Sequence, residues 1–264
     1  MKTFSTYLII GLTLFMAGCK KDPIVLPDAL TTVKANLEAE FDAINLDLAT
    51  GVDYAVSVGL DTTLIRAKLL ELLNRPSLVE EFCFVTPDGI LSMIEPSKYY
   101  YSQGIDISEQ DHIIKSFDTR SPVLSKVFRV VEGYDAAALI HPVVEYNTIK
   151  GGVVVVIKTE ELLASVMEPL LVGADFELWV MEKGGRMLYN QDDYEIGLNL
   201  FTDPVYKDFP ELVTAAGLIN DEESGTTTYS FYKTGTTTTV TKLTYWTTVE
   251  VYGTEWKVVW VRVE

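Results

Sequence analysis

The sequence predicts an α+β protein, in which one long N-terminal helix precedes two similar units that are each built on an antiparallel sheet. Apolar residues recur at steps of three and four between residues 33 and 48, which is the period of one buried face of an α-helix. From residue 79 the pattern changes to short apolar segments separated by turn residues, as is typical of β-structure. The order of hairpin, helix and three strands then occurs twice, with the two hairpins 96 residues apart. Such a repeat favours two copies of one α+β unit of roughly 90 residues.

Composition narrows the classes of function. The 264 residues are enough for one large domain or two smaller ones, and they carry 38 Asp and Glu against 21 Lys and Arg. The formal net charge of −17 excludes nucleic acid as a partner, because phosphate contacts need clustered basic side chains. Two His and two Cys leave little material for a Cys/His metal site. We therefore expect no metal and no other cofactor.

Residues 1–19 have the features of a lipoprotein signal peptide. Lys2 supplies a positive charge, and residues 7–17 form an apolar run of 11 residues, whereas a membrane-spanning helix needs about 20. The run ends in Met16-Ala17-Gly18-Cys19, which resembles the lipobox of bacterial and archaeal lipoproteins, although Leu is usual where Met16 stands. The resemblance implies that Cys19 becomes the N-terminus and carries a palmitate-type lipid. An ordinary signal peptide with an incidental cysteine, or an uncleaved anchor, is the alternative.

Residues 20–78 are expected to form a short spacer and the long helix, in one or two pieces. The apolar stripe of the helix consists of Val33, Leu37, Phe41, Ile44 and Leu48. We expect a kink or break at Gly51. Asp61 or Thr62 can cap a second helical piece, which Pro76 stops.

The first repeated unit is expected to cover residues 79–172. Its predicted elements are a hairpin of residues 82–85 and 90–94, a helix from Ser108 to Phe117, strands at 127–131, 136–145 and 152–158, and a helix at 160–171. Ser108, with Asp111 three residues later, resembles a capping box. Cys83 lies within the apolar first strand, so we expect a buried, inert thiol.

The second unit is expected to cover residues 173–264. Its predicted elements are a hairpin of residues 178–181 and 186–189, a helix at 205–216, and strands at 225–233, 236–247 and 256–263. Because no further pattern follows the last strand, we expect no transducer domain on this chain.

The order and spacing of these elements resemble the double Cache family of extracytoplasmic sensor domains, whose two PAS-like sheets are carried by one long N-terminal helix. The stretches that carry the resemblance are GIDISEQDHIIKSFDTRSPVLSKVF, ALIHPVVEYNTIKGGVVVVIKTEELL, WVMEKGGRMLYNQDDYEIGLNLFTDP and YWTTVEVYGTEWKVVWVRVE. The resemblance covers residues from about 28 to 264. It implies a membrane-distal Cache unit at 79–172, a membrane-proximal one at 173–264, and a small ligand bound in the distal unit, between its sheet and its short helix.

The resemblance also locates a candidate site. In amino-acid-binding members the short helix carries an Arg, a Trp and a Tyr, and a later Asp holds the amine of the ligand. Counted back from Pro122, the first three positions fall on Gln110, His112 and Ile113, and the Asp position falls near Val156. The bidentate Arg–carboxylate contact and the Asp–ammonium pair are therefore both absent. An amino acid bound in that mode is not expected.

Five single residues are candidates for contact with a ligand. His112 could donate a hydrogen bond to a ligand as a group that titrates near neutrality, or it could cover apolar surface. His141 is also a candidate ligand contact, although a core or edge histidine is the favoured interpretation. Tyr101, with its two tyrosine neighbours, could form a lid or simply pack on the surface. Ser125 and Phe128 are placed at the pocket by the resemblance alone.

Three functions remain open. The first is a small-molecule receptor, membrane-anchored through its lipid on the periplasmic or outer face of a cell, that passes its signal to a separate membrane partner. The second is a Cache scaffold without a ligand that mediates protein–protein interaction. The third is a surface hydrolase that uses two carboxylates, and it has the least support. The sequence contains no G-x-S-x-G, H-E-x-x-H or P-loop motif, so we expect no enzyme.

Overall fold

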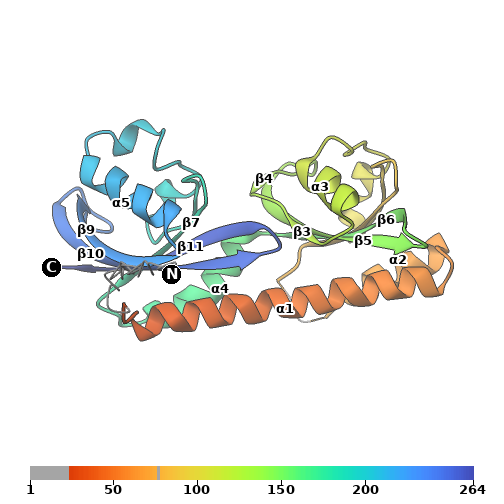
Figure 1. Cartoon of the computed structure of the whole chain (residues 1–264), viewed down its shortest axis with the longest axis horizontal. Coiled ribbons are helices and arrows are strands. Elements are labelled where there is room, and N and C mark those ends of the chain that lie inside the picture. Colours follow the sequence, from red (N-terminus) through yellow and green to blue (C-terminus); the bar gives the residue numbers. More distant parts are fainter. Residues whose placement is uncertain (1–23, 76–77) are drawn as a thin grey trace, which may run out of the picture.

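The computed structural model describes residues 24–75 and 78–264 (Figure 1). The helices are α1 (Asp28–Ser57), α2 (Thr62–Leu73), α3 (Asp111–Thr119), α4 (Thr159–Leu171) and α5 (Pro210–Asp221), with 3-10 turns η1 (Ser97–Ser102), η2 (Asp193–Glu195) and η3 (Pro204–Tyr206). The signal peptide and Cys19 lie outside the described residues. Within the described part of the chain, no helix combines the length and the apolar character that crossing a bilayer requires.

Two antiparallel sheets follow the first two helices. The strands of the first sheet are β1 (Glu81–Val85), β2 (Leu91–Glu95), β3 (Val123–Leu124), β4 (Phe128–Arg129), β5 (Asp135–Glu145) and β6 (Thr148–Ile157). Those of the second are β7 (Glu177–Glu182), β8 (Met187–Tyr189), β9 (Ser224–Tyr232), β10 (Thr239–Val251) and β11 (Thr254–Val263). The strand orders are β2-β1-β6-β5-β3, with β4 paired to β5, and β8-β7-β11-β10-β9. Both sheets have the same topology, so the predicted α+β fold with a repeated sheet unit is confirmed.

The repeat extends to single hydrogen bonds. After each hairpin the chain returns to a glycine of the turn: the amide of Ile107 donates to Gly89 O, and the amide of Leu200 donates to Gly185 O, both at 2.9 Å. Both glycines have positive φ values, of 82° and 95°. A side chain at either glycine would collide with the returning segment. The same turn is therefore required twice, 96 residues apart.

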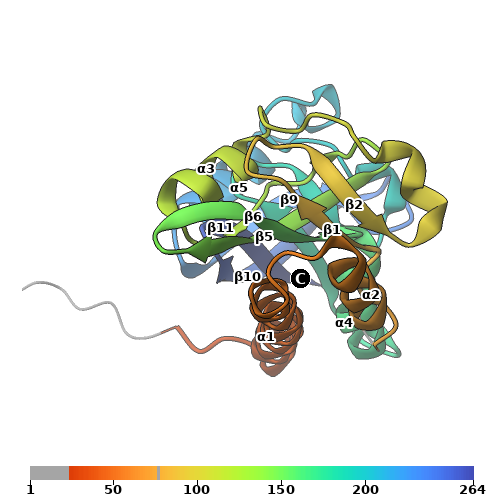
Figure 2. The same cartoon turned by 90° about the vertical axis from the view of Figure 1, so that its right-hand side faces the viewer.

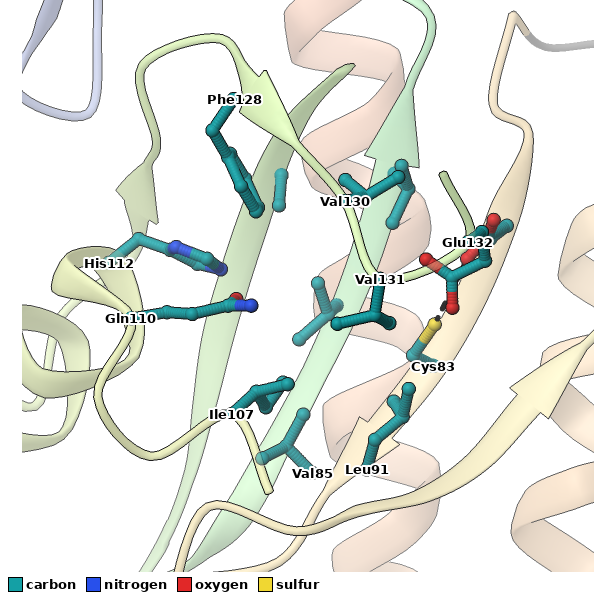
Figure 3. A pocket seen from close by; sticks show the side chains of 14 residues that line it. Cys83, Val85, Leu91, Ile107, Gln110, His112, Phe128, Val130, Val131 and Glu132 are labelled. Carbon is teal, nitrogen blue, oxygen red and sulfur yellow. Dashed lines mark hydrogen bonds between the residues drawn. The ribbon is translucent and has the colours of Figure 1, made fainter. Parts of the chain in front are cut away.

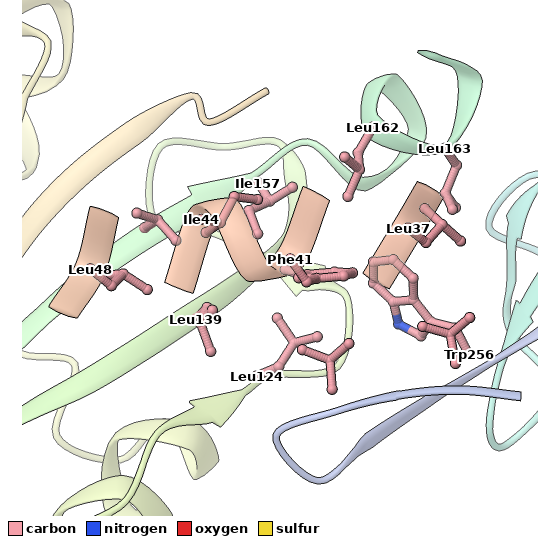
Figure 4. Packing of buried hydrophobic residues seen from close by; sticks show 14 of the residues in the cluster. Leu37, Phe41, Ile44, Leu48, Leu124, Leu139, Ile157, Leu162, Leu163 and Trp256 are labelled. Atoms are coloured by element: carbon pink, nitrogen blue, oxygen red, sulfur yellow. The ribbon is translucent and has the colours of Figure 1, made fainter. Parts of the chain in front are cut away.

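The long helix α1 connects the two units. It lies along the lower side of both sheets, its N-terminal half beside the second sheet and its C-terminal half beside the first (Figures 1 and 2). Leu37, Phe41, Ile44 and Leu48 are buried in one core cluster that contains residues of both sheets (Figure 4). The Phe41 ring meets the ring of Trp256 on β11 edge to face, with centroids 5.2 Å apart. The apolar stripe predicted from the sequence thus forms the shared core of the molecule.

The predicted break at Gly51 is wrong. Helix α1 is continuous to Ser57, and the chain reverses through Gly59 and Leu60, which both have positive φ values. A Cβ at Gly51 would lie 3.3 Å from side-chain atoms of Leu72 and Val153, so this glycine allows α1 to approach α2 and β6 closely. Asp61 caps α2 by accepting from the amides of Thr63 and Leu64, as predicted.

Other boundaries also differ from the prediction. Helix α3 begins at Asp111 rather than Ser108, because residues 108–110 form a turn that the Asp106 carboxylate holds by accepting from the Ser108 amide. Helix α5 begins at Pro210, not at residue 205, and strand β10 runs from Thr239 to Val251 rather than over 236–247. The expected strand at 127–131 is reduced to Phe128–Arg129, and β3 was not predicted.

Candidate functional site

A small cavity lies in the first unit, between the outer face of the sheet and the segment that runs from α3 to β4 (Figure 3). It leaves about 30 Å³ open, which is room for one or two water molecules. Aliphatic side chains form most of its wall, and they come from β1, β2, β5 and β6 and from the loops at residues 107 and 130–131. The polar side chains that line it are Glu81, Cys83, Gln110, His112 and Glu132.

Glu81 supplies the buried carboxylate at one end of this cavity. Its neighbour Glu80 points outward and binds Lys98 and Lys158, whereas Glu81, at the first position of β1, is fully buried and has no basic partner among the described residues. Its carboxylate accepts from the Tyr134 hydroxyl and lies 3.8 Å from Cys83 Sγ. Burial raises the pKa of Glu81 to about 8, and the charges of Glu132 and Glu80 add to the rise. At pH 7 this carboxyl is therefore mostly protonated, and it ionises as the pH rises through 8.

Glu132 brings a second carboxylate to the same end. It lies in the turn between β4 and β5, and its Oε1 is buried without a hydrogen-bond partner in the described structure. The Tyr101 hydroxyl donates to the backbone carbonyl of Glu132 at 3.4 Å and so ties the turn to η1. The cavity therefore has an acidic end with an acceptor that no described residue satisfies.

The opposite end carries His112 and Gln110. Gln110 precedes the first turn of α3 but makes no side-chain cap, and its amide points into the cavity (Figure 3). The His112 ring packs against Phe128, with centroids 5.4 Å apart, and only 5% of the residue is exposed. Burial lowers the pKa of His112 to about 4, so its imidazole is neutral at pH 7 and offers one donor and one acceptor. The titration near neutrality that was considered for His112 does not occur.

Outside these side chains lies an open cleft of about 470 Å³. Gln110, His112 and Phe128 line both the cavity and the cleft, so they separate the two spaces. The far wall of the cleft is the turn between β10 and β11 of the second unit. Thr254 of this turn donates its hydroxyl to Leu124 O at 2.7 Å, which joins the two units beside the cleft.

The structure brings together only part of the set of residues predicted from the sequence. Gln110, His112 and Phe128 line the cavity, and Ser125 lines the cleft, where its hydroxyl accepts from the Ala138 amide and donates to Lys126 O. Ser125 therefore has its hydrogen bonds satisfied by the backbone.

Three other expected residues lie elsewhere. Ile113 is buried in the core under α3, and Tyr101 is 66% exposed and reaches the site only through Glu132. His141 is in step with Leu139 on β5, whose side chain packs toward α1, so it lies on the opposite face of the sheet from the cavity. There its ring meets Tyr252 at 6.0 Å.

Sequence reasoning missed Glu81, Glu132 and the place of Cys83 in the lining. A signal for Glu81 was present, because Val156, the position of the ligand-binding Asp in the family that the chain resembles, is its register partner on β6. Glu81 thus places a carboxylate on the strand next to that position. The two carboxylates give no support to a glycoside hydrolase, since the cavity cannot hold a sugar ring. Among the described residues, no group of three or more His, Cys, Asp or Glu could hold a metal ion.

Comparison with known proteins agrees with this fold. A family model described as "HK/GC/Chemotaxis protein-like, sensor domain" matches residues 39–159, which contain most of α1 and the whole first sheet. The description is that of a sensor domain and not of an enzyme. No curated protein matches the chain.

Solved structures extend the likeness to both units. An extracellular ligand-binding receptor from Desulfohalobium retbaense is 24% identical with a TM-score of 0.75, over 89% of this chain and 39% of that chain. The ligand-binding domain of the Pseudomonas aeruginosa chemoreceptor PctC, in complex with GABA, is 14% identical with a TM-score of 0.62, over 88% of this chain and 96% of that one. That of the Pseudomonas fluorescens chemoreceptor CtaA, in complex with L-alanine, is 11% identical with a TM-score of 0.59, over 89% and 94%.

These likenesses define the class of fold. The chain has the double Cache fold, with two PAS-like sheets on one N-terminal helix. The chain spans less than half of the D. retbaense receptor that it matches. At these identities the solved structures establish the fold and leave the ligand to be inferred from the cavity itself.

Proposed function

We propose that this protein is an extracytoplasmic receptor that binds a small organic molecule in the cavity of its first unit. The observation that carries the proposal is the convergence of polar side chains on one small cavity: Glu81 and Glu132 at one end, and Gln110 and His112 at the other. Buried polar groups are normally hydrogen-bonded, yet the Glu132 acceptor has no partner. A ligand with a suitable donor would satisfy it.

Gln110, His112 and Phe128 separate the cavity from the cleft. Entry of a ligand from the cleft therefore requires these side chains to move aside. The space of about 30 Å³ describes the closed cavity, and the cleft of about 470 Å³ on the other side of these side chains provides room for the body of a ligand. The PctC and CtaA domains are in complex with GABA and L-alanine. The cavity described above has no arginine or lysine in its lining, so a different mode of binding is proposed for this chain.

We further propose that Cys19 carries a lipid that holds the protein at the membrane. The first turns of α1 lie beside the second sheet, where Lys34 Nζ donates to Thr248 O at 2.8 Å. Eight residues lie between Cys19 and Asp28, so the nine residue steps reach at most about 32 Å. This favours residues 173–264 as the membrane-proximal unit, residues 79–172 as the distal one, and a membrane protein as the partner that receives the signal.

The test is a thermal-shift screen of the detergent-solubilised full chain with organic acids, amines and nucleobases. At least one class should raise the melting temperature, and filling the cavity by Ala138→Phe should abolish the rise. A matched control variant is Leu46→Ala, which changes an exposed residue of α1 and should keep the response. No stabilisation by any class would refute the receptor function.

A ligand-free scaffold is the second candidate, and the small volume of the closed cavity favours it. A scaffold should tolerate Ala138→Phe without any loss of partner binding. It should also show no ligand response in the wild-type chain.

A further inference from the structure

The second unit contains a counterpart of the cavity, and there a buried lysine lies beside the carboxylate. Glu177 begins β7 as Glu81 begins β1, 96 residues earlier. Strand register confirms that the two glutamates are equivalent: Glu81 pairs with Val156 of β6, and Glu177 pairs with Val261 of β11. Both glutamates line the cavity of their own unit.

The register continues to the next strand of each sheet. Val156 pairs with Ala138 of β5, and Val261 pairs with Thr244 of β10. Two residues earlier on these strands, and therefore on the same face, stand Ala136 and Lys242. The pairing with the strand on the other side also makes Ala136 and Lys242 equivalent. Ala136 pairs with Phe128 of β4, and Lys242 pairs with Tyr229 of β9. Both aromatic residues line the cavity of their own unit.

At these equivalent places the two units differ in charge. In the second unit Lys242, which is 4% exposed, extends its ammonium to Glu177 Oε2 at 2.6 Å. In the first unit Ala136 ends in a methyl group, and the described hydrogen-bond partners of the Glu81 side chain are the hydroxyl of Tyr134 and the thiol of Cys83. The first cavity therefore retains the carboxylate but lacks the internal cation.

The two units also differ in the size of the side chain at another equivalent position. Trp179 stands in the second cavity where Cys83 stands in the first, 96 residues earlier. The second unit thus fills its cavity with an indole ring and a lysine side chain, whereas the first has a thiol and a methyl group at these places. The two cavities therefore differ in the side chains that line them more than in open volume, which is about 30 Å³ in the first unit and about 20 Å³ in the second.

We propose that the first cavity binds a small organic cation, a primary alkylamine without a carboxylate, whose ammonium takes the place that the Lys242 ammonium takes in the second unit. This inference rests on the proposed receptor function and names its class of ligand. The ammonium has three donors, and Glu81 and the unpartnered Oε1 of Glu132 accept two of them. Inside the cavity a carboxylate on the ligand would meet no lysine or arginine, since Lys115 and Lys126 line only the cleft outside it.

The experiment is titration calorimetry on the detergent-solubilised full chain at pH 8, with n-butylamine as the probe. Butyrate and n-butanol, which have the same number of carbons, are the matched ligand controls. Butylamine should bind at least tenfold more tightly than either. Glu81→Gln should weaken the binding of butylamine at least tenfold, and Glu177→Gln, the same change in the second unit, should alter it less than twofold.

A second variant supplies the missing lysine. Ala136→Lys should abolish butylamine binding and raise the melting temperature, because the new ammonium neutralises Glu81 as Lys242 neutralises Glu177. Ala136→Met fills a similar volume without the charge. It should therefore lack the rise in melting temperature that depends on Glu81. In the Glu81→Gln background the lysine variant should lose its advantage over the methionine variant. These comparisons also hold if Glu81→Gln alone folds poorly.

The outcomes separate this inference from the receptor function. If butyrate or a nucleobase binds in the cavity and butylamine does not, the amine is refuted while the receptor stands. If no class of compound binds and Ala136→Lys gives no Glu81-dependent stabilisation, both are refuted. If Glu81→Gln leaves butylamine binding unchanged, the assignment of the ammonium to Glu81 is overturned.

Discussion

Replacing Glu81 by Gln should remove a loss of stability that the wild-type chain undergoes between about pH 5 and pH 9. The buried carboxyl faces the Tyr134 hydroxyl, the Cys83 thiol and the acidic side chains of Glu132 and Glu80, with no cation beside it. Its pKa is raised in the folded chain from 4.5 to about 8. The folded state therefore binds this proton more tightly than the unfolded state does. The stabilisation is complete below pH 4.5 and is lost as the pH rises through 8.

The magnitude follows from the shift of about 3.5 pKa units. At about 1.4 kcal/mol per unit, the free energy of unfolding falls by at most about 5 kcal/mol across this range. Urea denaturation at pH 5 and at pH 9 gives the change in the free energy of unfolding with pH, for the wild type and for Glu81→Gln. The difference between these two changes is the contribution of Glu81. Glu195, whose pKa burial raises to about 7, is present in both proteins and cancels. Equal pH dependence in the wild type and in Glu81→Gln would refute the assignment of this proton to Glu81.

Three other perturbations have defined outcomes. Gly89→Ala should lower the free energy of unfolding in urea by about 1–3 kcal/mol, because φ is 82° and the new Cβ meets Ser108. The control Gly59→Ala, with φ of 60° and open space around it, should lower it less. Equal losses in the two variants would contradict this reasoning. Phe41→Ala should cost about 3–5 kcal/mol, because the ring joins α1 to Trp256, and a loss under about 1 kcal/mol would show that this core is not shared. Cys19→Ser should abolish incorporation of radiolabelled palmitate and release the chain from the membrane fraction, and continued labelling would place the lipid elsewhere.

Periodicity was a reliable guide where burial alone decides the structure. The stripe from Val33 to Leu48 predicted the buried face of α1, because a helix that packs on two sheets must keep one side apolar along its length. The same periodicity could not assign Gly51. A glycine reads as a helix breaker in the sequence, and only the packing of Leu72 and Val153 against it shows that it permits close contact.

The candidate site was harder to predict, because its polar residues depend on register. Glu80 and Glu81 are adjacent and chemically identical in the sequence, and only the start of β1 at Glu81 decides which one meets the solvent and which one the cavity. His141 illustrates the same limit, since one step along β5 moves a side chain to the other face of the sheet. The hairpin repeat was visible from the sequence, but the pairing of Glu177 with Lys242 joins strands 65 residues apart.

The continuity of α1 has a mechanical consequence. Its 30 residues form a rod about 45 Å long, fixed by its apolar face to the first sheet at one end and to the second sheet at the other. A rod of this length acts as a lever: a tilt of about 3° at one end displaces the other end by roughly 2 Å. Two domains joined by a flexible linker would lose such a displacement. A small rearrangement of the first sheet that tilted α1 would therefore displace the opposite end of the helix, beside the second sheet.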